Sequence, residues 1–277
     1  MDADHDAGVP DAPARLSATQ LRAMRELVRP RGRAKAGQFL AEGPQAVREA
    51  LAAGVVGWLV VTDDAAARDT IASMLDVATD AGVVVHRAEP TQMMQFTDTV
   101  HGQGLVAVCR MPGVRLDDVP APRLVVVADQ VRDPGNLGTL IRNADAFGAD
   151  AVVLTPGCVE PWNPKVVRAS VGSLFHVPLA VDVPLSEAVG WLRAHGVEVL
   201  AADAGGEPLD ELAREGGLAG PAAWVVGNEA WGLSPADVAL CDRVVSVPMG
   251  GRAESLNVAS ASAVCLYVTA QEQRRDP

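Results

Sequence analysis

Apolar residues occur along this chain in two arrangements, which divide it into a shorter first part and a longer second part. In the first part, apolar runs of three to five residues alternate with two segments of helical spacing. The runs are residues 39–41, 57–61, 83–85 and 105–108, and the helical segments are 44–53 and 65–80. Short strands separated by helices predict a small α/β domain over residues 15–110.

The second part contains apolar runs that are more nearly continuous and are separated by stretches that favour helix. These runs are residues 124–128, 151–154, 197–200, 223–226 and 243–247, and a final helix is predicted over 255–272. Apolar strands of this kind, with helices between them, indicate a parallel sheet covered on both faces. We therefore predict a second α/β domain over residues 123–273, preceded by a Pro-containing linker at 111–122.

The segment before the first strand is rich in basic residues. Residues 1–14 are acidic and Pro/Ala-rich, so a disordered tail is expected there. The apolar spacing over residues 15–29 predicts a short basic helix, and Pro30 to Arg33 a basic loop. Residues 15–50 hold eight basic and three acidic side chains, although the whole chain carries a net charge of −12. Charge alone fits a nucleic-acid-binding face and a merely solvated surface equally well.

Composition narrows the class of protein further. The hydrophobic content of 49% is enough for substantial cores, and the four cysteines are too scattered to suggest a metal site or thiol exchange. The chain shows neither a basic start followed by an apolar stretch nor an apolar run of membrane-spanning length. We therefore expect a cytoplasmic protein with reduced cysteines, no metal and no membrane partner.

Three polar segments each follow a predicted strand of the second part, at residues 129–144, 227–234 and 248–260. The carboxyl ends of parallel strands are where such sheets bind ligands. A carboxylate such as Glu229 at this edge would be costly to bury without a partner, which favours a functional role over a solvated loop. The first segment could by itself be an ordinary strand-to-helix turn. Because it lacks the G-x-G-x-x-G spacing, a nucleotide-dependent oxidoreductase is disfavoured.

Taken together, these segments resemble the three ordered motifs of the SpoU family of RNA ribose methyltransferases. The motifs are Asn136-x-Gly138-x-x-x-Arg142, then Val226-Gly227-Asn228-Glu229, then Pro248-Met249-Gly250 with Ser255-Leu256-Asn257-Val258. Residues 163–172 are also typical of that family. The resemblance spans residues 123–272 and implies a deep trefoil knot, bound S-adenosyl-L-methionine and a homodimer. A shorter match, from Arg33 to Gly43, is similar to the ribosomal-protein-like substrate-binding domain of many such enzymes.

The resemblance also implies roles for individual residues. The catalytic set is Arg142, Asn136, Glu229, Ser255 and Asn257. The cofactor-binding set is Thr155, Pro156, Gly157, Gly227, Asn228, Val247, Met249 and Leu256. Independently of the resemblance, the basic run suggests RNA contacts by Arg29, Arg31, Arg33 and Lys35, and three-residue helical spacing suggests contacts by Lys165 and Arg168. Arg142 would act on the 2′-hydroxyl either as a proton acceptor or through a neighbouring phosphate. Because a guanidinium is effectively always protonated, we favour the second role, in which Arg142 orients the phosphate and stabilises developing negative charge.

The expected activity is therefore S-adenosylmethionine-dependent methylation of a ribose 2′-hydroxyl in RNA. Ribosomal RNA is favoured because the smallest transfer-RNA enzymes of the family lack an N-terminal domain, and the layout is similar to the thiostrepton-resistance type. Two alternatives stay open: a transfer-RNA 2′-O-methyltransferase, and a non-catalytic RNA-binding or ribosome-assembly protein on the same fold. The presence of every motif residue disfavours the second.

Overall fold

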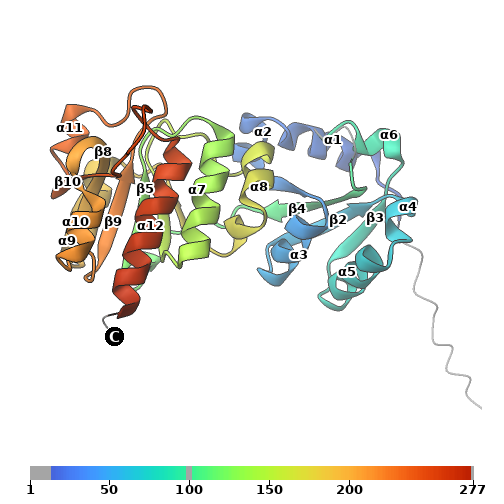
Figure 1. Cartoon of the computed structure of the whole chain (residues 1–277). Coiled ribbons are helices and arrows are strands. Elements are labelled where there is room, and N and C mark those ends of the chain that lie inside the picture. Colours follow the sequence, from blue (N-terminus) through green and yellow to red (C-terminus); the bar gives the residue numbers. More distant parts are fainter. Residues whose placement is uncertain (1–13, 98–101, 276–277) are drawn as a thin grey trace, which may run out of the picture. The chain divides into compact units, whose positions relative to one another are not determined.

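The computed structural model describes residues 14–97 and 102–275, so the predicted disordered tail at residues 1–14 lies almost wholly outside the described part. The chain divides into two compact units, Met1–Arg110 and Met111–Pro277. Figure 1 shows the elements of each unit, coloured along the sequence. Each unit is built on its own sheet.

The first unit is an α/β domain around a four-stranded mixed sheet of order β1-β4-β2-β3. Strand β4 pairs antiparallel with both β1 and β2, whereas β2 and β3 are parallel. Helix α1 packs on this sheet through Met24 and Leu27, which lie in one core with Leu40, Val60 and Val106. The elements are α1(Ala18–Leu27), α2(Pro30–Ala36), β1(Gln38–Glu42), α3(Pro44–Ala52), β2(Val56–Val61), α4(Asp63–Ala66), α5(Asp69–Asp80), β3(Val84–Arg87), α6(Pro90–Met93) and β4(Leu105–Arg110).

The basic loop predicted at residues 30–33 is wrong, because this segment begins helix α2. Pro30 occupies the first turn, where its missing N–H costs nothing. Gly32 lies so close to the end of α1 that an added Cβ would be 2.0 Å from the carbonyl oxygen of Glu26. The Pro and Gly that suggested a break therefore permit a tight connection between two helices.

The second unit contains a six-stranded sheet of order β10-β8-β9-β5-β6-β7, in which every pairing is parallel. The predicted parallel sheet is confirmed. The elements are η1(Leu116–Asp118), β5(Leu124–Ala128), α7(Pro134–Phe147), β6(Ala151–Leu154), α8(Pro164–Ser170), η2(Ser173–Phe175), β7(Leu179–Val181), α9(Leu185–Ala194), β8(Glu198–Pro208), α10(Leu209–Arg214), β9(Ala222–Val226), α11(Pro235–Val238), β10(Arg243–Ser246) and α12(Val258–Arg275).

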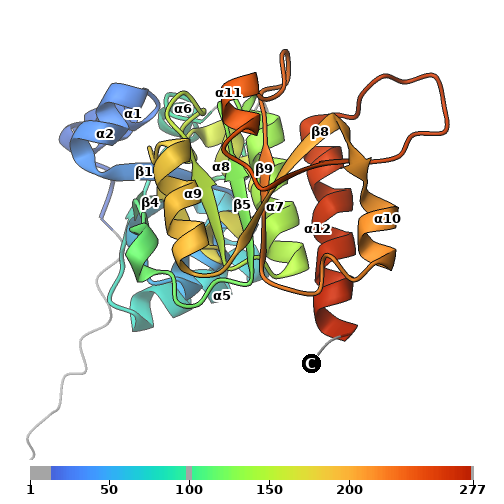
Figure 2. The ribbon, with the colours of Figure 1, turned by 90° about the vertical axis from the view of Figure 1, so that its left-hand side faces the viewer.

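Helices cover both faces of this sheet, as strand β9 illustrates. Ala223 and Val225 join the core that includes α9, through Ala188 and Leu192. The intervening Trp224 is fully buried and donates its indole N–H to the Thr269 hydroxyl of α12 at 2.9 Å. Successive side chains of a strand point to opposite faces, so α9 and α12 lie on opposite sides of the sheet, as Figure 2 shows.

Three features of the second unit differ from the prediction. The segment expected to be a linker packs onto the second unit, since Leu116 and Val119 are buried in its core. The edge strand β7, which has only three residues, was not predicted. Helix α12 begins at Val258 and not at residue 255. In the described part of the chain, no helix is long and apolar enough to cross a membrane.

Candidate active site

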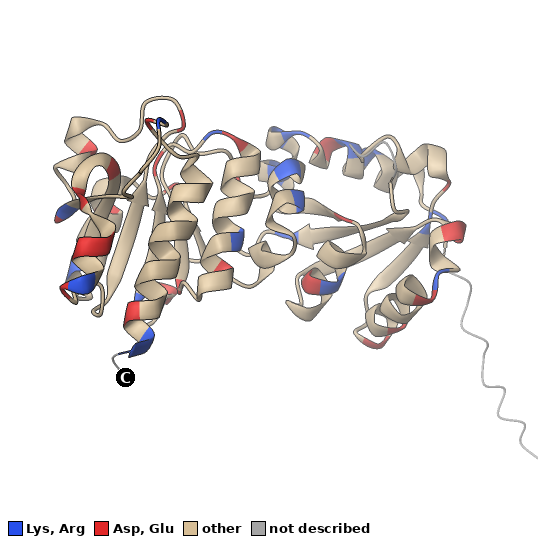
Figure 3. Ribbon diagram, in the orientation of Figure 1, with Lys and Arg blue, Asp and Glu red and all other residues tan. Residues whose placement is uncertain are grey.

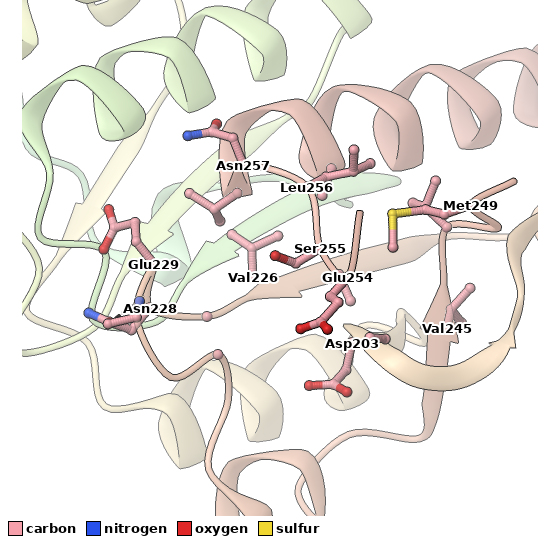
Figure 4. A pocket seen from close by; sticks show the side chains of 18 residues that line it. Asp203, Val226, Asn228, Glu229, Val245, Met249, Glu254, Ser255, Leu256 and Asn257 are labelled. Atoms are coloured by element: carbon pink, nitrogen blue, oxygen red, sulfur yellow. Dashed lines mark hydrogen bonds between the residues drawn. The ribbon is translucent and has the colours of Figure 1, made fainter. Parts of the chain in front are cut away.

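A cavity of about 460 Å³ lies at the carboxyl-end edge of the second unit's sheet. Its walls come from strand β8, from the segments that follow β9 and β10, and from the start of α12. Figure 4 shows the side chains that line it. The volume is in the range typical of pockets for a single small molecule or cofactor.

One wall of the cavity is a bulge in strand β8. Along the β8–β10 pairing, Val244 faces Ala201 but the next residue, Val245, faces Glu207, so residues 202–206 are looped out of the ladder. Gly206 makes this possible, because an added Cβ would lie 2.4 Å from the backbone of Val244. The bulge brings Asp203 to the cavity wall.

The Glu229 carboxylate at the cavity edge is held by N–H donors from the first polar segment. Its Oε1 accepts from the backbone N–H of Asp133 at 3.0 Å and from the Asn136 side-chain amide at 3.2 Å. Its Oε2 accepts from the backbone N–H of Arg132 at 3.3 Å. Burial by itself would raise the pKa of Glu229, but these bonds and one from its own backbone N–H hold the pKa below its ordinary value. Glu229 is therefore an ionised acceptor at neutral pH.

Asn136 extends this network to the third polar segment. Its side-chain oxygen accepts a hydrogen bond of 2.8 Å from the Asn257 amide. Asn257 also caps the N-terminus of α12, since its side-chain oxygen accepts from the backbone N–H of Ala259 at 2.9 Å. Hydrogen bonds thus join Asn136, Glu229 and Asn257, which come from three segments far apart in the sequence.

Gly227 and Asn228 shape the turn that carries Glu229. Asn228 and Gly232 exchange two backbone hydrogen bonds of 3.1 and 2.9 Å, which close the turn. Gly227 fits beneath it because an added Cβ would lie 2.4 Å from the Gly232 carbonyl carbon. The Asn228 side chain is buried and donates to the backbone oxygen of Gln130 at 2.8 Å. Asn228 therefore fixes the turn against the first polar segment.

The structure places many of the predicted site residues around the cavity. The lining residues predicted to be catalytic are Glu229, Ser255 and Asn257, and those predicted to bind cofactor are Gly227, Asn228, Val247, Met249 and Leu256. Ser255 lies in the exposed segment before α12 and not in its first turn.

Five of the residues predicted to be catalytic or to bind cofactor do not line this cavity: Asn136, which is linked to it through Glu229 and Asn257, and Arg142, Thr155, Pro156 and Gly157. Thr155 is buried, and its hydroxyl donates to the Asp129 carboxylate at 2.7 Å, while Pro156 and Gly157 are exposed elsewhere. Arg142 is exposed on α7, six residues or about 9 Å along the helix from Asn136. It forms no hydrogen bond or ion pair with any residue in the described ranges, so its guanidinium can reach an external ligand.

The predicted RNA-binding residues of the first unit separate into two kinds. Arg29, Arg31 and Lys35 are exposed, and Figure 3 shows basic residues along α1 and α2. Arg33 is only 1% exposed, and its Nη1 donates to the carbonyl oxygens of Leu27 and Val28, both at 2.8 Å. The prediction that Arg33 grips RNA is therefore wrong, because its guanidinium binds the end of α1 instead.

In the second unit, the two basic residues predicted to contact RNA lie on α8. Lys165 is exposed there and Arg168 is half-buried. Sequence reasoning missed two acidic residues of the cavity wall, Asp203 and Glu254. Asp203 follows an apolar run without a motif, although Glu254 adjoins the predicted Ser255 and could have been included on that ground.

A parallel α/β domain whose edge loops enclose a cavity beside a linked Asn–Glu–Asn set has the arrangement expected of a SpoU methyltransferase. The model of the SpoU rRNA Methylase family matches residues 123–267, and the chain belongs to this family. A second model, the MRM3-like substrate binding domain, matches residues 18–107. The family identified from the three motifs is confirmed.

Relatives and solved structures agree with this assignment. The chain is 37% identical over 237 residues to the 23S rRNA (guanosine(2553)-2'-O)-methyltransferase RlmP of Bacillus subtilis (strain 168), covering 85% of this chain and 89% of that protein. The SpoU methyltransferase AviRb from Streptomyces viridochromogenes, in complex with the cofactor AdoMet, superposes with a TM-score of 0.81 at 28% identity, covering 94% of this chain and 100% of that one. An AdoMet-bound rRNA methyltransferase from Sinorhizobium meliloti also gives a TM-score of 0.81, at 29% identity and with 93% and 96% of the two chains covered. These likenesses bear out the predicted fold class and are consistent with the knotted C-terminal domain.

Proposed function

We propose that this protein transfers the methyl group of S-adenosyl-L-methionine to a ribose 2′-hydroxyl of ribosomal RNA. The observation that carries the proposal is the hydrogen-bonded set of Asn136, Glu229 and Asn257 at the rim of a cofactor-sized cavity. The proposal is supported by the membership of the chain in the SpoU family and by relatives named as 23S rRNA 2'-O-methyltransferases.

The cavity has the chemistry that S-adenosylmethionine requires. Val226, Met249 and Leu256 supply apolar surface for an adenine ring, and Asp203 and Glu254 supply negative charge for a ligand with a sulfonium and an ammonium group. When bound, the cofactor supplies an electrophilic methyl group. The residues of the chain have to bring a ribose oxygen into line with that methyl group and receive the hydroxyl proton, which makes positioning a large part of the rate.

We assign the positioning to the linked polar residues and the electrostatic work to Arg142. The ionised Glu229 fixes the backbone N–H groups of Arg132 and Asp133, and so fixes the start of the helix that carries Arg142. The Arg142 guanidinium orients an RNA phosphate beside the 2′-hydroxyl and stabilises the negative charge that develops on the ribose 2′-oxygen. The proton then passes to that phosphate or to water.

Substrate capture belongs to the first unit, for which we propose residues 15–110 as the RNA-binding domain. Arg29, Arg31 and Lys35 are exposed cations that suit contacts to the RNA backbone, which confer affinity more than sequence choice. On the second unit, Lys165 and Arg168 are proposed to contact RNA as well. The expected site of action is the cytoplasm.

A homodimer is also part of the proposal. Helix α12 exposes Val264 by 37% and Tyr267 by 52%, although much of that helix is packed against the sheet. Exposed apolar side chains on a long helix suit contact with a second copy of the chain. Sedimentation equilibrium should give twice the chain mass, and Tyr267→Glu should shift it toward the monomer. A monomer in the wild type would refute this part.

The function is tested by transfer of tritium from labelled S-adenosylmethionine to ribosomal and transfer RNA from cells that lack the protein, followed by mapping of 2′-O-methyl groups. Label confined to ribosomal RNA supports the proposal, and label in transfer RNA alone would replace its substrate. Binding of the cofactor without label in either RNA or in ribosomal particles would indicate a non-catalytic protein.

Arg142 can be tested in the same assay. Arg142→Ala should abolish methyl transfer but leave cofactor affinity unchanged, because the side chain does not line the cavity. Arg142→Lys keeps the charge without the planar fork and should retain only part of the rate. Full turnover by the alanine variant would remove Arg142 from the mechanism.

A further inference from the structure

A large aromatic side chain lies exposed at the rim of the cavity. Trp231 is 54% exposed, although the residues on either side of it, Ala230 and Gly232, both line the cavity. The guanidinium of Arg132 lies over its ring, 4.9 Å from the ring centroid. Neither residue belongs to the cavity wall or to the set that links Asn136, Glu229 and Asn257.

The other exposed aromatic residue in the described part of the chain has a packing partner of its own kind. Tyr267 is 52% exposed and contacts Phe147 edge-on, with ring centroids 5.9 Å apart. Trp231, by contrast, has a flat cation as its ring partner and leaves about half of its surface in water. An indole so exposed contributes little to the core, which suggests that it binds something else.

Hydrogen bonds anchor the two segments that carry Trp231 and Arg132. Trp231 lies within the turn closed by the two hydrogen bonds between Asn228 and Gly232. Arg132 donates its backbone N–H to Glu229 and a guanidinium N–H to the Gln130 side chain at 3.3 Å. The backbones of both residues are thus anchored to the segments that carry the Asn–Glu–Asn set, which keeps both residues beside the active site.

We propose that Trp231 and Arg132 form a stacking platform for an unpaired base of the substrate RNA at the mouth of the active site. This inference rests on the proposed function. Proteins hold unstacked RNA bases on aromatic rings and on guanidinium planes, and here one of each is combined. Sequence-specific RNA recognition mostly targets loops, bulges and ends whose unstacked bases can be splayed out, and the platform would replace the stacking that such a base has lost. Arg132 adds a positive charge toward the RNA backbone.

The test compares substitutions that differ in their ability to stack. Trp231→Leu keeps an apolar side chain without a ring, Trp231→Ala removes it, and Trp231→Phe retains a smaller ring. For each, we would measure the KM and kcat for ribosomal RNA from cells that lack the protein, the Kd for that RNA by filter binding, and the Kd for S-adenosylmethionine. The melting temperature verifies folding, which these changes at an exposed position should preserve.

Stacking predicts that Trp231→Leu and Trp231→Ala raise the KM and Kd for RNA roughly tenfold or more, whereas Trp231→Phe stays near the wild type. Cofactor affinity should not change in any of them. An RNA affinity unchanged in the leucine variant would overturn the inference, and so would an equal loss in the phenylalanine and leucine variants. Failure of the proposed function looks different, since the wild type itself would then not methylate RNA.

Discussion

Asn136→Asp tests whether hydrogen bonding between distant segments builds the active site. The two side chains have the same shape, so packing is unchanged. The oxygen that accepts from Asn257 is retained, but the N–H that donates to Glu229 at 3.2 Å is replaced by a second carboxylate oxygen. A single atom exchange thus converts an attraction into a repulsion.

The size of the effect follows from the distance. Two unit charges this far apart repel by about 1 kcal/mol in a water-like medium and by about 5 kcal/mol at an effective dielectric constant of 20. The lost hydrogen bond to a charged group adds about 1.5 to 3 kcal/mol before solvent replacement is considered. Because water reaches Glu229, we expect a total loss of about 2 to 4 kcal/mol at pH 8, or about 5 to 10 °C in melting temperature.

The pH dependence of the variant is more diagnostic than its stability at one pH. Each carboxylate raises the pKa of the other, so the folded variant binds a proton more tightly than the unfolded chain does. A folded state that holds the extra proton gains stability as the pH falls. The melting temperature of Asn136→Asp should therefore recover on acidification from pH 8 to 5.5, together with cofactor affinity, while the wild type shows no such recovery.

A matched control is available at Asn163, which caps α8 by accepting from the backbone N–H of Lys165 at 2.9 Å. Aspartate caps helices as well as asparagine does, so Asn163→Asp should leave stability and its pH profile unchanged. Thermal unfolding and titration calorimetry between pH 5.5 and 8 would be run on all three proteins. If Asn136→Asp matched the wild type at pH 8, the hydrogen bonds from Asn136 would not be what holds the segments together.

Four further changes have expected outcomes that can be measured directly. Gly138→Ala would place a methyl group 2.4 Å from the Ala169 Cβ, so the free energy of unfolding in urea should drop by about 1 to 3 kcal/mol or more; no drop would mean that α7 and α8 separate easily. Arg33→Ala removes a buried guanidinium, whose pKa burial lowers, together with its hydrogen bonds to the carbonyl oxygens of Leu27 and Val28. The change should cost about 2 to 4 kcal/mol of stability. Arg31→Ala should instead leave the melting temperature unchanged and reduce the salt dependence of RNA binding by about one counterion. A loss of stability in the Arg31 variant, or a loss of RNA binding alone in the Arg33 variant, would contradict the roles assigned to these two residues. Glu229→Gln places an amide NH₂ among N–H donors and should weaken cofactor binding about tenfold by calorimetry, so an unchanged Kd would separate the network from the cavity.

The sheet of the second unit could be predicted because three of its inner strands are apolar throughout. Strands β5, β6 and β9 are buried at every position. Apolar runs of this kind between helices are typical of a parallel sheet that is covered on both faces. The three-residue strand β7 was missed because a run so short carries no period. The glycines at 205 and 206 hid the extension of β8, although these residues form the bulge that brings Asp203 to the cavity.

The candidate site was predictable as far as its residues belong to family motifs. The motif residues Glu229, Asn257 and Met249 do border one cavity. Spacing along the chain could not show that Asn136 contacts both Glu229 and Asn257, since those bonds span more than ninety residues. Nor could charge show that Arg33 turns inward while Arg31 faces solvent, because the direction of a side chain depends on the packing of two helices.

The dependence of the cavity on α12 has a consequence for the protein during its own synthesis. The first unit has all its strands once β4 is complete at residue 110, but the cavity still lacks a wall until the residues around Asn257 and Ala261 have been added. A chain under translation therefore completes the unit proposed to bind RNA long before it can form the cavity. If that proposal holds, a chain that stops short of α12 would bind RNA without modifying it, so the removal of such fragments would matter more than for an enzyme whose active site forms early.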